Sequence, residues 1–113
     1  MIMNEKNLLE KLDAVKTEME RNLQLIVSAL KIVEFKEVLS FDELQKLLLL
    51  IVLLNNSDNA IIEAFDGIDY SNVNHTAEIT TVNYLILALH QQILDGMKKL
   101  DDRINDLGLL KIA

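Results

Sequence analysis

The chain has 113 residues, of which 50% are hydrophobic and only 4% aromatic, and it contains no proline and no cysteine. This length fits one domain, 1–113, and the lack of cysteine excludes disulfides and thiolate metal sites. The net charge is −7, so the basic surface that phosphate backbones require is missing, and we expect direct binding to neither nucleic acid nor a membrane.

The first predicted element is a long helix over 5–39. Its apolar residues recur at steps of three and four, which places them on one helical face. From Leu23 onward Leu25, Val27 and Ile32 widen this face, so we expect the second half of the helix to be enclosed on more than one side. The residues of the stripe are Leu8, Leu12, Val15, Met19, Leu23, Ile26, Leu30 and Val33.

Ser40 and Glu43 have the spacing of a capping box, which predicts the start of a second helix over 41–54. Leu39 and Leu44 stand at the two positions of a hydrophobic staple around this start. The helix is apolar on every side along 47–54. A membrane span needs about 20 apolar residues, so this shorter run predicts a buried core helix.

The polar residues 55–59 predict a break, followed by a short third helix over 59–65 that Ser57 or Asp58 caps. A loop over 66–75 follows, and its length makes it a candidate functional segment. The loop is rich in oxygen ligands, but no reading frame has the glycine and glutamate positions of an EF-hand. We therefore expect turn chemistry rather than a calcium site.

A second long helix is predicted over 76–107, with Gly108 as its C-terminal cap and an apolar tail over 109–113. Its apolar residues also recur at steps of three and four, which again indicates one buried face. They are Ile79, Val82, Ile86, Leu89, Ile93, Met97, Leu100, Ile104 and Leu107.

These elements predict an all-α fold: two long antiparallel helices with two shorter helices between them. A helix that is apolar all round must be surrounded, and the other helices of one chain cover only part of it. We therefore expect a homodimeric bundle, with the second helix and the Leu23–Val38 half of the first at its centre. The expected interface residues are Leu47, Leu48, Leu50, Ile51, Leu54, Leu109, Leu110 and Ile112.

Candidate catalytic groups are few. Glu34 and Glu37 form the Glu-x-x-Glu pair found in all-α nucleotide pyrophosphohydrolases that bind magnesium, and a second set of acids would be Asp101, Asp102 and Asp106. Solvated surface charges are the simpler reading of all five. We expect no catalytic residue, no metal and no cofactor.

Three polar residues lie beside the stripes. We expect His90 to be half-buried and hydrogen-bonded, and Asn22 and Asn83 to face water at the stripe margins. The alternative for a polar residue at a helix seam is that it fixes the register of packing.

The predicted function is therefore non-enzymatic. We expect a small acidic adaptor, assembly chaperone or inhibitor that binds itself and a further protein, in the cytoplasm of a bacterium or of a phage host. The alternatives are the magnesium-dependent hydrolase, a bundle that holds an apolar ligand near Ile26, Leu30, Ile86 and Leu89, and a structural subunit that forms filaments.

Overall fold

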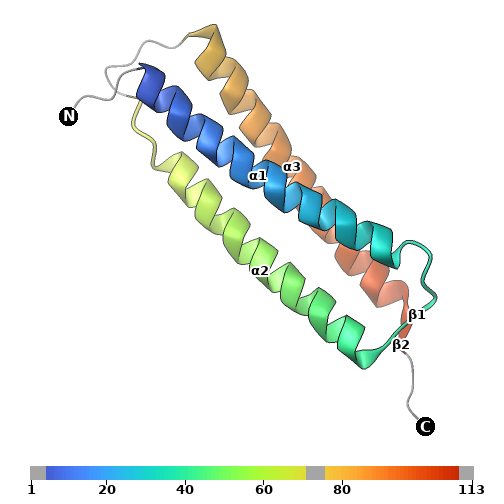
Figure 1. Cartoon of the computed structure of the whole chain (residues 1–113). Coiled ribbons are helices and arrows are strands. Elements are labelled where there is room, and N and C mark those ends of the chain that lie inside the picture. Colours follow the sequence, from blue (N-terminus) through green and yellow to red (C-terminus); the bar gives the residue numbers. More distant parts are fainter. Residues whose placement is uncertain (1–4, 71–75, 110–113) are drawn as a thin grey trace.

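The computed structural model describes residues 5–70 and 76–109, and it confirms an all-α fold. Three long helices lie side by side in an elongated bundle (Figure 1). The elements in chain order are α1 (Glu5–Val33), β1 (Val38–Leu39), α2 (Phe41–Asp66), α3 (Ala77–Asp106) and β2 (Gly108–Leu109).

The middle of the chain forms one helix of 26 residues. The prediction of two short helices separated by a break at 55–59 is therefore wrong. Ser57 and Asp58 do not cap a helix, because their side chains meet Asn22 of α1 and His90 of α3. These tertiary hydrogen bonds take the place of the local backbone bonds that usually make such residues helix breakers.

The relative direction of the two longest helices also differs from the prediction. Because α2 spans the whole bundle, the chain returns to its starting end before α3 begins, so α1 and α3 run in the same direction (Figure 1). The predicted antiparallel arrangement of this pair is wrong. The parallel pairing of Val38 with Gly108 and of Leu39 with Leu109 joins the segments that follow the two helices.

The core consists of the two predicted stripes, which the structure confirms. Five residues of the α1 stripe and five of the α3 stripe are buried, and the remaining members are half-buried. The buried ones are Leu8, Leu12, Met19, Ile26, Val33, Ile79, Ile86, Ile93, Leu100 and Ile104. Leu47 and Leu54 of α2 complete this interior.

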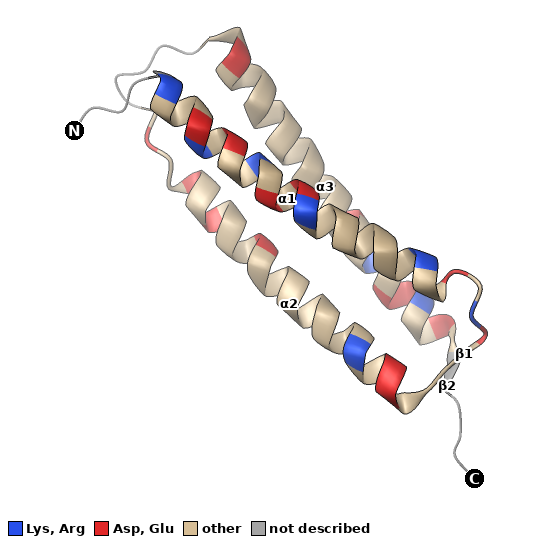
Figure 2. Ribbon diagram, viewed as in Figure 1, with Lys and Arg blue, Asp and Glu red and all other residues tan. Residues whose placement is uncertain are grey.

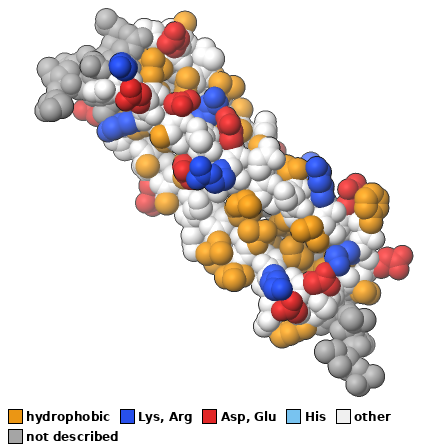
Figure 3. All heavy atoms as spheres, in the orientation of Figure 1, with side chains coloured by type: hydrophobic (Ala, Val, Ile, Leu, Met, Phe, Trp, Pro, Cys, Tyr) orange, Lys and Arg blue, Asp and Glu red, His pale blue; other side chains and the backbone are white. Residues whose placement is uncertain are grey.

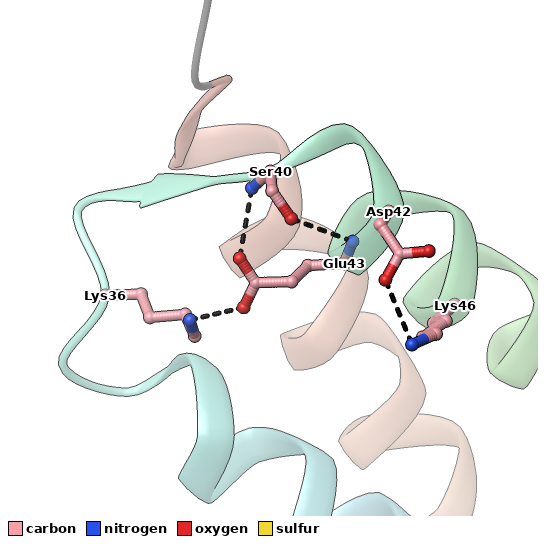
Figure 4. Close-up of polar contacts among 5 residues, drawn as sticks. All are labelled: Lys36, Ser40, Asp42, Glu43 and Lys46. Carbon is pink, nitrogen blue, oxygen red and sulfur yellow. Dashed lines mark hydrogen bonds and ion pairs between the residues drawn. The ribbon is translucent and has the colours of Figure 1, made fainter.

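Side chains hold the start of α2, where the connection from α1 ends. Ser40 accepts a hydrogen bond from the backbone N–H of Glu43, and the Glu43 carboxylate accepts one from the backbone N–H of Ser40 (Figure 4). The predicted capping box is thus confirmed. Leu39 is buried and Leu44 packs against the same core cluster, as a staple requires.

Two helix ends differ from their predicted positions. α1 ends at Val33 rather than at residue 39, because Arg103 of α3 donates hydrogen bonds to the backbone oxygens of Val33, Glu34 and Lys36. Gly108 does not cap α3. Leu107 takes that place with an extended backbone, and Gly108 pairs with Val38 in the two-stranded sheet.

Candidate functional site

The outer face of α2 is an exposed apolar surface. We define it by five side chains that are each between 44% and 58% exposed: Phe41, Leu48, Leu49, Val52 and Leu53. No charged residue lies between Lys46 and Asp58, so the middle of α2 is uncharged along its length (Figure 2). Contiguous exposed apolar surface of this kind marks binding sites more often than chance.

Two exposed side chains of α1 extend this surface. Asn22 donates a hydrogen bond to Ser57 across the antiparallel α1–α2 contact, which fixes the relative level of the two helices. One turn from this bond lie Leu25 on α1 and Leu53 on α2. One further turn along α2 lies Leu49, and two further turns along α1 lies Ile32. All four are exposed, and Figure 3 shows hydrophobic side chains gathered over this part of α1 and α2.

The charges around the outer face are already paired within single helices. Lys46 lies 2.9 Å from Asp42 on α2 (Figure 4), and Arg21 lies 3.0 Å from Glu18 on α1. These exposed pairs add little stability. They leave the rim of the surface nearly neutral, so a strongly basic or strongly acidic partner would find no complementary field there.

The five predicted interface residues on α2 divide into three groups by their burial. Leu47 and Leu54 are buried within their own chain and are therefore removed from the surface, whereas Leu50 and Ile51 are half-buried against the core. Leu48 is exposed. The backbone of Leu109 forms β2, while Leu110 and Ile112 lie outside the described residues. The sequence did not distinguish which residues of this helix point outward, because an all-apolar helix carries no pattern that distinguishes its faces.

The interior contains one level of polar side chains, which we call the polar layer: Asn22 of α1, Ser57 and Asp58 of α2, and His90 of α3. Asn22 Nδ2 donates to Ser57 Oγ at 3.0 Å. The Asp58 side chain is 1% exposed, and its two carboxylate oxygens lie 3.1 and 3.3 Å from His90 Nδ1. Neighbouring residues of α2 thus bind α1 and α3 at the same height.

The polar layer confirms one prediction and corrects another. His90 is half-buried and hydrogen-bonded, as expected. Asn22 is buried, so the expectation that it faces water is wrong, and the alternative role of a polar residue at a packing seam applies to it. Asn83 is half-buried and accepts a hydrogen bond from the hydroxyl of Tyr70 at 3.0 Å. Burial raises the pKa of that tyrosine.

The acids proposed for magnesium do not converge. Glu34 and Glu37 lie in the connection that follows α1, not on a helix, and both are exposed. Asp101, Asp102 and Asp106 are exposed on the last turns of α3. Within 5–70 and 76–109 no group of three or more His, Asp or Glu side chains is placed to hold a metal ion. The arrangement that the hydrolase hypothesis requires is therefore not formed.

Two further surfaces offer no built site. A groove between the first turns of α1 and α3 is lined by Lys6, Glu10, Asp13 and Glu78 beside Leu9 and Val82, with charges of both signs open to solvent. Ile26 and Ile86, expected to line a ligand cavity, are fully buried in one packed cluster. The apolar-ligand hypothesis therefore gains no support from these residues.

α2 is long and apolar enough to cross a membrane by length and composition alone, although the sequence predicted a buried core helix. Every stretch of 18 residues within Phe41–Asp66 includes Asp58. The charge of this aspartate would oppose insertion of such a span.

No protein-family model, no curated protein and no solved structure matches this chain.

Proposed function

We propose that this chain is a non-enzymatic protein–protein interaction module that acts as a homodimeric helical bundle. The observation that carries the proposal is the outer face of α2, which continues across Leu25 and Ile32 of α1. Fully burying a side chain of this size contributes about 1.5–3 kcal/mol. Several half-exposed side chains on one surface therefore provide a substantial driving force for association.

The size of this surface fits a second copy. At about 25 cal/mol per Å2, the same transfer energies correspond to roughly 60–120 Å2 for each side chain. Seven half-exposed side chains then give about 200–400 Å2 of apolar area: Phe41, Leu48, Leu49, Val52, Leu53, Leu25 and Ile32. A standard interface buries about 800 Å2 per partner, somewhat more than half of it apolar. The surface thus supplies roughly half or more of the apolar area needed.

The charges also support self-association. The rim is nearly neutral because Lys46 and Arg21 are paired with acids of their own helices. Two copies that meet through this surface would therefore bring few unpaired charges close together. Most of the net charge of −7 on each chain would lie away from the contact. An adaptor, an assembly chaperone and an inhibitor all fit this proposal, and the second protein that the module serves would bind the dimer.

Mass measurement by light scattering tests the proposal. We expect the mass of two chains for the unchanged protein and of one chain for the double variant Leu49→Asp/Leu53→Asp, with helix content retained in both. Tyr84→Asp is the matched control, because Tyr84 is exposed on α3 outside this surface, and it should remain dimeric. A single-chain mass for the unchanged protein at high micromolar concentration would refute self-association. A mass that grows continuously with concentration would favour the filament-forming subunit instead.

A further inference from the structure

The antiparallel contact of α1 with α2 has a definite register. Both helices rise equally per residue, so residues at one level have residue numbers with a constant sum. The hydrogen bond between Asn22 and Ser57 sets this sum at about 79. Ala29 and Leu50 have the same sum, and Leu50 packs against the core cluster that contains Ala29. Positions on α1 and α2 can therefore be compared level by level.

The exposed apolar side chains of both helices are arranged symmetrically about one level. This level, which we call the centre, lies between residues 28 and 29 on α1 and between residues 50 and 51 on α2. On α1, Leu25 and Ile32 are exposed and lie equally far from the centre, on opposite sides. On α2 the centre has two exposed apolar residues on each side: Leu48, Leu49, Val52 and Leu53. The surface is therefore complementary to itself when one copy is turned end over end about the centre.

Two kinds of twofold axis can bring two such surfaces face to face, and twofold dimers are the commonest homo-oligomers. An axis along the helices places α1 of one copy opposite α2 of the other. An axis perpendicular to the helices places α1 opposite α1 and α2 opposite α2, with each pair antiparallel. The two axes therefore differ in which outer margins of the surface come together.

The outer margin of α2 is apolar, whereas that of α1 is polar. Because a helix turns by about 100° per residue, Leu48 and Val52 point further from α1 than Leu49 and Leu53 do, and both are exposed. The corresponding exposed side chains of α1, on its side away from α2, are Gln24, Ser28 and Lys31.

These margins favour the perpendicular axis. An axis along the helices would press Leu48 and Val52 against Ser28 and Lys31 of the second copy, and burying an unpaired charge is unfavourable. The perpendicular axis instead pairs the apolar margin with its own copy and leaves the polar margin beside its own copy.

We infer that the second copy binds antiparallel, with its α2 against α2 and its α1 against α1, around a twofold axis at the centre. Leu49 then meets Leu53 of the second copy, and Leu25 meets Ile32 of the second copy. This inference rests on the proposed function, because it specifies how the two chains of the homodimer are arranged.

The charged residues at the start of α2 are compatible with this arrangement. Asp42 lies at the level of Asn59 of the second copy, and Lys46 lies at the level of Asn55. These two charges are already paired with each other at 2.9 Å. Each therefore comes opposite an uncharged amide that can donate or accept a hydrogen bond.

Disulfide formation between two single-cysteine variants tests the arrangement, because the chain has no cysteine of its own. Gln45→Cys and Asn56→Cys replace exposed polar residues of α2 and leave the apolar side chains in place. In the inferred dimer, position 45 lies at the level of position 56 of the second copy. Two copies of the same position are about 16 Å apart along the helix axis, whereas a disulfide requires Cα atoms within about 7 Å.

The two variants are mixed under reducing conditions, left to exchange chains and then oxidised. Random pairing would give equal amounts of mixed dimers and of same-variant dimers. We expect the mixed disulfide to exceed both same-variant disulfides together by about tenfold or more. Tyr84→Cys is the matched control, because Tyr84 is exposed on α3 outside this surface. Mixed with Gln45→Cys, it should show no preference for the mixed product.

Light scattering on the reduced variants separates failure of the arrangement from failure of the homodimer. A two-chain mass without a preferred mixed disulfide would overturn the antiparallel arrangement and leave the proposed homodimer standing. A single-chain mass for both variants and for the unchanged protein would overturn both, and the apolar surface would then be left for a different protein.

Discussion

The side chain of Ile26 on α1 occupies the space beside Gly96 on α3, and a Cβ atom on that glycine would lie 2.7 Å from Ile26 Cγ2. Real Cβ atoms do not approach this closely, so Gly96 is the point at which the two longest helices can come together. Both residues are buried. The parallel α1–α3 contact therefore depends on a missing side chain at one position.

Gly96→Ala should lower the free energy of unfolding by about 1–3 kcal/mol, the usual cost of overpacking a core. The better helix propensity of alanine, worth about 1 kcal/mol, offsets only part of this loss. Urea unfolding followed by circular dichroism measures the change. Gly67→Ala is the matched control, because its nearest contact would be 3.4 Å and its φ is −80°. Equal stability of the two variants would show that α1 and α3 separate easily.

Removing either partner of the Asp58–His90 pair should destabilise the protein unequally. His90→Ala leaves a fully buried carboxylate without its partner, which costs about 3 kcal/mol or more. Asp58→Ala leaves His90, which is 27% exposed and can still reach water, so the loss should be about 1–2 kcal/mol. Urea unfolding of the two single variants and the double variant gives the coupling energy. A larger loss for Asp58→Ala than for His90→Ala would contradict this account.

Arg103 should contribute to stability through the end of α1 rather than through an ion pair. Its guanidinium donates to Val33, Glu34 and Lys36 backbone oxygens at 3.2, 3.2 and 2.7 Å. Arg103→Ala should lower the free energy of unfolding by about 1.5–3 kcal/mol. Arg103→Lys should recover less than half of this, because an ammonium cannot form the same fork of bonds. Full recovery by lysine in urea unfolding would show that only the positive charge matters.

The stability of the α1–α2 connection should depend on acid in a defined range. The Lys36 ammonium, and then the backbone N–H and hydroxyl of Ser40, lower the pKa of Glu43 from 4.5 to about 2. A lowered pKa means that the folded state favours the ionised form. This stabilisation is complete above pH 4.5 and is lost as the pH falls through about 2. Glu43→Gln should remove this part of the pH dependence, and NMR titration of the Glu43 carboxyl checks the pKa directly.

Ser40→Ala is the companion variant for that experiment. It removes the hydroxyl but keeps the backbone N–H and Lys36, so the pKa of Glu43 should rise while remaining below its ordinary value. An ordinary pKa for Glu43 in the unchanged protein would show that the ion pair with Lys36 does not form in solution.

The stripes of α1 and α3 and the start of α2 could be predicted because each depends on residues close together in sequence. Periodic apolar residues and the Ser40–Glu43 box encode their own structure. The continuity of α2 could not be predicted in this way. Ser57 and Asp58 are helix breakers locally, and only Asn22 and His90, more than 30 residues away, turn them into packing residues.

The same limit applies to the candidate site. The apolar character of 47–54 is plain in the sequence, but which of its residues face outward follows from how α2 packs against α1 and α3. The early end of α1 has a similar cause, because its last carbonyls are capped from Arg103, 70 residues further along the chain.

The pairing of α1 with α3 also has a consequence for synthesis. A ribosome adds about 5–20 residues per second, so the 70 residues that separate Val33 from Arg103 take roughly 4–14 s to appear. During this interval the emerging polypeptide holds the apolar stripe of α1 with only α2 as cover. The nascent α1–α2 hairpin is therefore the species that chaperones and neighbouring nascent chains encounter first.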